Sequence, residues 1–204
     1  MGDKRVGMKP SRAPAKLVLE AARRIDERGL TPPGTGNVSM LAAGLVYITP
    51  AKGGLKRLGG IEESDISIVS LEGEALEGPQ PSTELPAHLM IYRRCRNKVS
   101  AIVHAHPPYA TAYAHVGIAP THLAEAMALK IEVIPYHPPG SRDLAEACSE
   151  AVSSGADTLM LAKHGVLTVG GDLSEACTRL ELIEYLCKLD FISRAARRLL
   201  VDSD

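Results

Sequence analysis

Residues 99–107 read Val-Ser-Ala-Ile-Val-His-Ala-His-Pro, a largely apolar run that ends in two histidines. Its apolar and β-branched first part is typical of an interior strand. In a strand, residues two apart point to the same face, so His104 and His106 lie together. Two imidazoles on one face can bind one metal ion, and histidine suits zinc. Two histidines on one strand face can equally be surface residues, so this pair alone leaves both interpretations open.

On either side of this strand, other short strand-like runs alternate with helical patterns. The interspersed order predicts an α/β architecture, a three-layer α/β/α sandwich around one sheet. Several connections are too short for helical crossovers, so the sheet is predicted to be mostly antiparallel. The strands are expected near residues 37–40, 45–48, 66–71, 99–106, 131–134, 158–162 and 166–169, and the helices near residues 15–28, 84–96, 141–153 and 172–199.

The composition narrows the classes of protein that this chain can be. A length of 204 residues with 45% apolar residues suits one domain with a substantial core, expected over residues 14–204 behind a disordered tail, 1–13. A net charge of -1 and an aromatic content of 3% argue against nucleic acid as a partner. There is no apolar run of ~20 residues and no signal-peptide core, so no membrane association and a cytoplasmic location are expected.

A third histidine strengthens the metal hypothesis. His164 lies between two apolar strand-like segments and precedes Gly165, which we expect to permit a tight turn. Three neutral imidazoles leave one coordination position of zinc open for water or substrate, as in catalytic sites. The alternative for His164 is a buried, hydrogen-bonded histidine without a metal.

A carboxylate that could move protons follows Pro81-Ser82-Thr83. Glu84 either stabilises the start of a helix or acts as an acid/base beside the metal. Ser82 and Thr83 either cap that helix or donate hydrogen bonds to a phosphate at its N-terminus. His88, one turn beyond Glu84, is interpreted as a supporting or packing residue rather than a ligand.

The stretch Gly34-Thr35-Gly36-Asn37 is a second polar, glycine-rich segment, and it leads into a strand. Alone it is an unspecific turn motif. Together with the residues above it becomes a candidate for binding a phosphate or an oxyanion.

Six short motifs occur in the order that is typical of the class II aldolase/adducin family, and the chain resembles that family over about residues 15–200. Within the family it resembles most the L-fuculose-1-phosphate aldolase branch. The motifs are Gly36-Asn37-Val38-Ser39, Ile48-Thr49-Pro50, Pro81-Ser82-Thr83-Glu84, His104-x-His106-Pro107, Pro138-Pro139-Gly140-Ser141 and Lys163-His164-Gly165.

The resemblance implies an α/β/α fold, assembled as a homotetramer with active sites between subunits. It implies one zinc ion per subunit, with the family's ligands falling on His104, His106 and His164. The family's catalytic carboxylate falls on Glu84. Its phosphate-binding residues fall on Asn37, Ser82 and Thr83.

Two features depart from the family pattern. The loop after Thr49-Pro50 reads Ala51-Lys52-Gly53 and lacks the usual hydroxyl, so we expect Lys52 and Gly53 to bind the phosphate instead.

The second departure concerns a tyrosine. The family's tyrosine after the metal histidines is replaced by Leu123, and no tyrosine follows Tyr185 in the C-terminal segment. Tyr109, Tyr113 and His122 are the alternatives for the missing proton donor.

Together with these residues, the resemblance implies a zinc-dependent aldolase that cleaves a phosphorylated ketose, such as L-fuculose 1-phosphate, to dihydroxyacetone phosphate and an aldehyde through a metal-stabilised enediolate. One alternative is a relative acting on another sugar phosphate, such as a methylthioribulose-1-phosphate dehydratase. An epimerase is disfavoured because that branch carries Asp in place of Glu84. The alternative from another class is a non-catalytic, adducin-like interaction domain, against which the three histidines and Glu84 argue.

Overall fold

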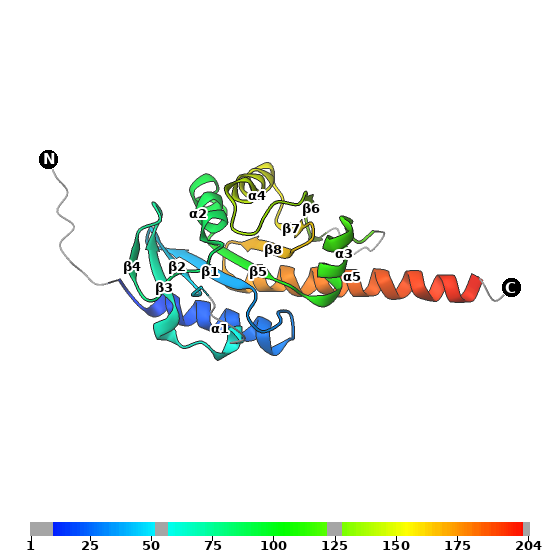
Figure 1. The fold of residues 1–204 in the computed structure, drawn as a ribbon, viewed down its shortest axis with the longest axis horizontal. Coiled ribbons are helices and arrows are strands. Elements are labelled where there is room, and N and C mark those ends of the chain that lie inside the picture. Colours follow the sequence, from blue (N-terminus) through cyan, green and yellow to red (C-terminus); the bar gives the residue numbers. More distant parts are fainter. Residues whose placement is uncertain (1–9, 52–56, 122–127, 202–204) are drawn as a thin grey trace.

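The computed structural model describes residues 10–51, 57–121 and 128–201, and it places one eight-stranded mixed sheet between two layers of helices (Figure 1). The strand order is β4-β3-β2-β1-β5-β8-β7-β6. Among the strands of the described residues, only β6 and β7 pair in parallel, so the predicted α/β architecture with a mostly antiparallel sheet is confirmed. The strands are β1 (Asn37–Ala42), β2 (Leu45–Ile48), β3 (Ser67–Ser70), β4 (Ala75–Glu77), β5 (Ala101–Ala105), β6 (Ile131–Ile134), β7 (Thr158–Leu161) and β8 (Gly165–Gly170).

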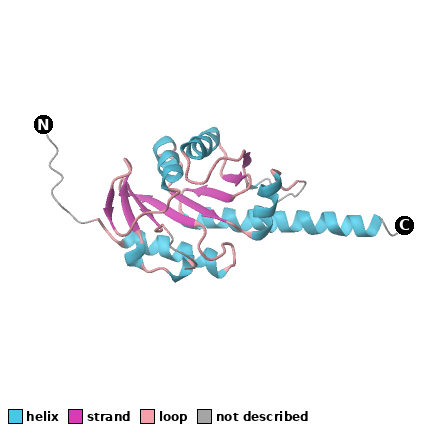
Figure 2. Cartoon of the chain, viewed as in Figure 1, coloured by secondary structure: helices cyan, strands magenta, loops and turns pink. Residues whose placement is uncertain are grey.

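Helices cover both faces of the sheet, as Figure 2 shows. On one face α1 (Ala13–Glu27), α3 (Pro108–Val116) and α5 (Leu173–Val201) enclose an apolar cluster with the sheet. On the other face α2 (Leu85–Arg94) and α4 (Arg142–Ser154) pack against each other and enclose a second cluster. Strands β5 and β7 contribute side chains to both apolar layers, which explains their nearly continuous apolar runs.

The strand β5 lies at the centre of the sheet and pairs with β1 and β8. In this register Asn37 is opposite His104 on one side, and Leu167 is opposite His104 on the other. The motif-bearing segments, which are far apart in the sequence, therefore meet at one end of the central strands.

Some elements differ from the sequence prediction. Helix α3 was not expected, although Pro108 at its first position and Gly117 after its end, with φ of +72°, are typical boundary signals. The short edge strand β4 was also missed. The short 3-10 helix Leu58–Gly60 was not expected either: Leu58 is fully buried there, and Arg57 before it pairs with buried Asp26 at 3.0 Å.

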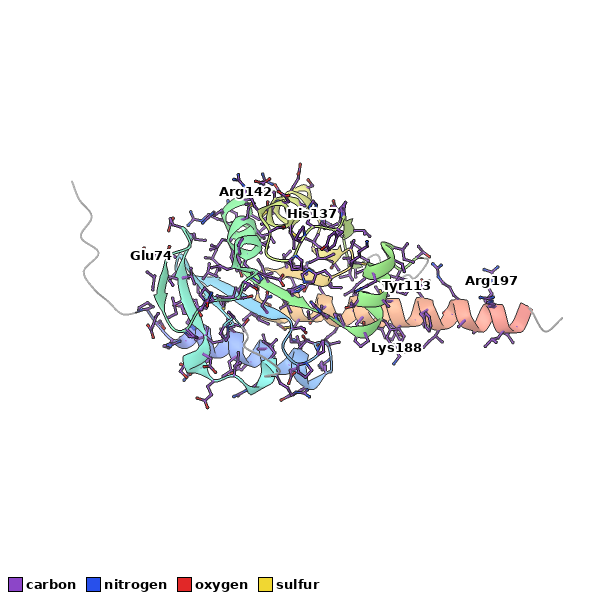
Figure 3. All side chains as sticks on the ribbon, in the orientation of Figure 1. Glu74, Tyr113, His137, Arg142, Lys188 and Arg197 are labelled. Atoms are coloured by element: carbon purple, nitrogen blue, oxygen red, sulfur yellow. The ribbon has the colours of Figure 1, made fainter. Side chains whose placement is uncertain are left out.

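Helix α5 continues past the rest of the fold, so that Arg197 projects into solvent far from the sheet (Figures 1 and 3). Leu199 and Leu200 near its end are more than 70% exposed. Among the described residues, no helix is both long enough and apolar enough to cross a membrane.

Candidate active site

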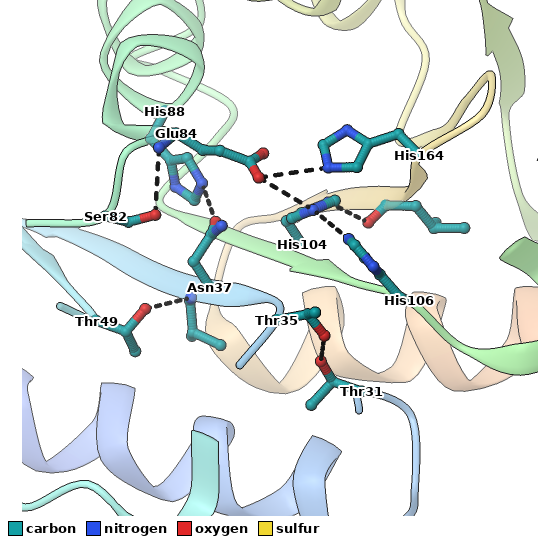
Figure 4. Close-up of polar contacts among 12 residues, drawn as sticks. Thr31, Thr35, Asn37, Thr49, Ser82, Glu84, His88, His104, His106 and His164 are labelled. Carbon is teal, nitrogen blue, oxygen red and sulfur yellow. Dashed lines mark hydrogen bonds and ion pairs between the residues drawn. The ribbon is translucent and has the colours of Figure 1, made fainter. Parts of the chain in front are cut away.

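Three histidines converge at the end of the central strands (Figure 4). His104 is the fourth residue of β5, His106 follows that strand, and His164 lies in the turn between β7 and β8. One ring nitrogen from each lies within 4.8 Å of the others, and the Nε2 atoms of His104 and His106 are 3.1 Å apart. Nitrogens bound to one tetrahedral zinc ion lie roughly 3.3–3.4 Å apart, as follows from bonds of about 2.0–2.1 Å. The arrangement fits a single metal ion.

A hydrogen bond determines which nitrogen of His104 faces the site. His104 Nδ1 lies 2.9 Å from the carbonyl oxygen of Val166, a fully buried contact. A carbonyl can only accept, so Nδ1 carries the hydrogen and Nε2 keeps its lone pair. Such a bond to the distal nitrogen is typical of metal-binding histidines.

Glu84 completes the cluster. It is the residue before α2, and its Oε1 lies 3.5 Å from His104 Nε2 and 3.4 Å from His164 Nε2. Burial by itself raises the pKa of Glu84, but His104 and His164 outweigh burial and lower it to about 2. The side chain is therefore a carboxylate at neutral pH, able to accept a proton or to share a metal ion with the histidines.

Gly165 is required for a reason that the sequence did not indicate. The expected tight turn is present, but its left-handed residue is Lys163, with φ of +57°, so the turn does not depend on the backbone freedom of Gly165. A Cβ atom on Gly165 would instead lie 2.6 Å from Cδ2 of His106 and 2.7 Å from the carbonyl oxygen of Ala105. The missing side chain lets the imidazole of His106 lie directly against β8.

We expect Gly165→Ala to displace the His106 ring and to weaken metal binding about 10–100-fold, the range seen when the support of a ligand is removed. Competition with a chelator, followed by metal analysis, measures this change. Gly60→Ala is the matched control, because a Cβ there meets no atom within 4 Å. Unchanged metal affinity in Gly165→Ala would show that the His106 ring can shift without cost.

A polar cavity of about 190 Å³ opens beside the histidines. Its walls are residues 34–37, Pro50, Ala51, residues 82–84 and His106. The segments 49–51 and 80–82 are held together by hydrogen bonds from Ala51 N to Gln80 O and from Ser82 N to Thr49 O. The structure thus brings Asn37, Ser82, Thr83 and Glu84 to one cavity that His106 also lines.

Ser82 and His88 support the backbone before α2 and the side chain of Asn37, respectively. Helix α2 begins at Leu85, and Ser82 Oγ accepts a hydrogen bond from the backbone of Glu84 at 3.3 Å. His88 is fully buried and lies 2.6 Å from Asn37 Oδ1. Burial lowers the pKa of His88 to about 3, so its ring is neutral and supports Asn37.

Several predicted site residues lie outside the described residues. They are Lys52, Gly53, His122 and Leu123. Of the remaining candidates for a proton donor, the Tyr113 hydroxyl donates to Asp190 Oδ2 at 2.7 Å, and Tyr109 contacts Phe191. The hydrogen of the Tyr113 hydroxyl is thus used in a bond to α5 and does not point to a substrate.

The family to which the chain belongs follows from comparison with known proteins. The model of the class II aldolase and adducin N-terminal domain matches residues 16–191. The chain belongs to the class II aldolase and adducin family. This is the family that the six sequence motifs predicted, and its members include metal-dependent carbon–carbon lyases, so the chain is a class II aldolase-type enzyme.

Individual relatives carry two different activities in their names. The L-fuculose phosphate aldolase of Methanococcus maripaludis is 35% identical over 179 residues, which cover 85% of this chain and 94% of that protein. The 3-oxo-tetronate 4-phosphate decarboxylase of Haemophilus influenzae is 34% identical over 202 residues, 94% of each chain. A solved L-fuculose 1-phosphate aldolase superimposes with a TM-score of 0.82 at 29% identity and covers 91% of this chain and 88% of its own.

Proposed function

We propose that this enzyme cleaves a phosphorylated ketose to dihydroxyacetone phosphate and an aldehyde, with one zinc ion per subunit bound by His104, His106 and His164. The observation that carries the proposal is the position of one carboxylate, that of Glu84, between the three histidines and a polar cavity. A bound zinc ion supplies Lewis acidity at the ketone oxygen of the substrate.

Glu84 is the proposed acid/base. In the synthetic direction its carboxylate removes a proton from the carbon that will attack the aldehyde, and the new hydroxyl takes up a proton as the C–C bond forms. In the cleavage direction the hydroxyl of the departing carbon gives up its proton as the C–C bond breaks, and Glu84 takes up a proton and returns it to the carbon that has lost the aldehyde. Its low pKa keeps it ionised before synthesis begins. Its Oε1 lies less than 4 Å from two of the proposed ligands, so the proton is moved beside the ketone.

The phosphate of the substrate is proposed to occupy the polar cavity. Asn37, Ser82 and Thr83 line it, as do the backbone groups of residues 34–36. Hydroxyl, amide and backbone N–H donors from a glycine-rich turn suit an anion. Lys52 and Gly53, in the segment that follows Ala51, remain proposed contacts of the same phosphate.

A second candidate reaction is the decarboxylation of a phosphorylated 3-oxo acid. The relative with that name aligns with 94% of this chain. Loss of carbon dioxide from a 3-oxo-tetronate 4-phosphate leaves the same three-carbon phosphorylated unit as aldol cleavage, and Glu84 then protonates the same carbon. This reaction needs no group that recognises an aldehyde, which agrees with the departure from the family tyrosine at Leu123.

Other proposals from the sequence receive less support. A dehydratase of a related sugar phosphate uses the same residues, but the relatives described above carry aldolase and decarboxylase names. A non-catalytic interaction domain has no use for a carboxylate within 3.5 Å of two of three converging histidines. A homotetramer with sites between subunits stays part of the proposal.

We expect the zinc-loaded enzyme to exchange one carbon-bound proton of dihydroxyacetone phosphate for solvent deuterium and then to add that unit to several aldehydes with mixed stereochemistry. NMR measures the exchange and the product stereochemistry. A panel of ketose phosphates and 3-oxo-tetronate 4-phosphate, scored for triose phosphate and for carbon dioxide, separates aldolase from decarboxylase. A zinc-loaded protein without exchange contradicts both reactions.

A further inference from the structure

A chain of buried hydrogen bonds runs from α2 to the wall of the cavity. Tyr92, one turn beyond His88 on α2, has its hydroxyl 2.7 Å from Ser39 Oγ. Ser39 Oγ lies 2.6 Å from His88 Nδ1, and His88 Nε2 lies 2.6 Å from Asn37 Oδ1. All four residues are at most 3% exposed, and Figure 4 shows the last bond of the chain.

The chain has a preferred direction. Burial raises the pKa of Tyr92 well above its usual value, so the hydroxyl keeps its hydrogen. Among the described residues Ser39 Oγ is the sole hydrogen-bond partner of that hydroxyl, so Tyr92 donates to Ser39. Ser39 must then donate its own hydrogen to His88 Nδ1. The hydrogen of His88 is therefore on Nε2, which donates to Asn37 Oδ1.

The opposite direction would leave a buried donor without an acceptor. Ser39 would then donate to Tyr92, and the hydrogen of the Tyr92 hydroxyl would have no acceptor in the part of the chain that the structure describes. An unsatisfied buried donor is costly, whereas an oxygen lone pair without a partner is tolerated more often. The direction from Tyr92 to Asn37 is the one in which every hydrogen of the chain is donated.

This direction determines which end of the Asn37 amide is free for a ligand. The amide oxygen is held by His88, so the NH2 group is the end left for the cavity that Asn37 lines. An anion needs a donor there. If the amide were rotated by half a turn, its oxygen would face the anion in a cavity that already contains the carboxylate of Glu84.

We propose that His88 is a positioning residue which, through Ser39 and Tyr92, fixes the amide of Asn37 with its NH2 group toward the phosphate of the substrate. This inference rests on the proposed phosphate site, but it does not depend on which bond the enzyme breaks. It gives His88 a defined task in substrate binding without contact to the substrate.

The first test measures the tautomer of His88 in the wild-type protein and uses a variant only to assign the signal. In the ¹⁵N spectrum of histidine-labelled, zinc-loaded protein, we expect His88 to be neutral with its hydrogen on Nε2 and a bare Nδ1. The signal is assigned by its loss in His88→Gln. A hydrogen on Nδ1 of His88 would reverse the chain and overturn the proposal.

The second test compares two substitutions at one position. His88→Gln keeps an N–H that can donate to Asn37, whereas His88→Leu removes it at similar volume. We expect His88→Leu to bind inorganic phosphate about 10–100-fold more weakly than the wild type, the loss expected for one hydrogen bond to a charged group. His88→Gln should stay within about threefold. Calorimetric titration measures phosphate binding, and zinc content with the thermal midpoint shows that each variant is folded.

The substrate supplies a further control. With dihydroxyacetone phosphate, His88→Leu should raise KM for deuterium exchange, whereas exchange with unphosphorylated dihydroxyacetone should be unchanged. Equal losses with both substrates would mean that His88 only supports the fold, and would overturn the proposal. Phosphate binding that depends on His88 in a protein without exchange activity would uphold the positioning role and reject the proposed reaction. A wild type that does not bind phosphate would reject the positioning role.

Discussion

Glu84→Gln is expected to leave the metal content and the fold intact and to lower turnover on the order of 100-fold or more, the contribution typical of a positioned acid/base. The substitution keeps the size and shape of the side chain and replaces its ionisable carboxylate by a neutral amide. Because Oε1 lies 3.4 Å from His164 Nε2 and 3.5 Å from His104 Nε2, the variant changes an ionisable group that lies directly beside the proposed ligands.

The low pKa of Glu84 determines which charge the substitution removes. A pKa of about 2 means that the wild-type side chain is a carboxylate across the neutral pH range, so the variant removes a full negative charge. A glutamine cannot take a proton from carbon. Deuterium exchange of dihydroxyacetone phosphate should therefore fall in parallel with turnover, while binding of inorganic phosphate stays the same or becomes tighter.

Glu74→Gln is the matched control, because Glu74 lies exposed at the far end of the sheet (Figure 3). It makes the same chemical change with no expected effect on turnover. Near-normal exchange in Glu84→Gln would show that Glu84 serves only the start of α2, and the acid/base would have to be sought elsewhere.

The central part of this site could be predicted from the sequence because its signals are local. The spacing of His104 and His106 reflects the alternation of a strand, and the apolar run before them predicted β5. The position of Asn37 beside His104 follows from the pairing of β1 with β5, which the sequence alone does not reveal. The order of six short motifs supplied that information through the family.

What the sequence missed depends on distances between segments. Gly165 looks like an ordinary turn glycine, yet it is needed because the His106 ring lies where its Cβ would be. The direction of the hydrogen bonds from Tyr92 to Asn37 depends on three contacts between β1 and α2. Spacing places residues 37 and 39 on one strand face and residues 88 and 92 on one helix face, but no spacing rule connects the two pairs, because their segments lie far apart along the chain.

The metal site leads to the second expected loss. We expect His106→Ala to reduce zinc from about one ion per subunit to a small fraction after dialysis, and turnover to fall with it. Loss of a partner that merely supports a ligand weakens metal binding ~10–100-fold, so removal of a ligand should cost on the order of 100-fold or more.

His106 is the best of the three histidines for this test. His104 is fully buried on the central strand and bonded to the Val166 carbonyl, so its removal would leave a cavity in the core and delete a buried hydrogen bond. His106 is partly exposed at the end of that strand. Its truncation therefore removes a nitrogen 3.1 Å from His104 Nε2 with little loss of packing.

Metal analysis of the dialysed proteins, together with thermal unfolding with and without added zinc, measures the effect. A ligand that binds only the folded state raises the unfolding midpoint, so the wild type should gain stability with zinc and His106→Ala should gain much less. His115→Ala is the control, because it removes an exposed imidazole on α3 that is not a proposed ligand. The Nδ1 atom of His115 lies 3.0 Å from the carbonyl oxygen of Thr111, within the same helix. Equal zinc in His106→Ala and the wild type would exclude His106 as a ligand. The ion would then have to bind at a position other than the cluster of His104, His106 and His164.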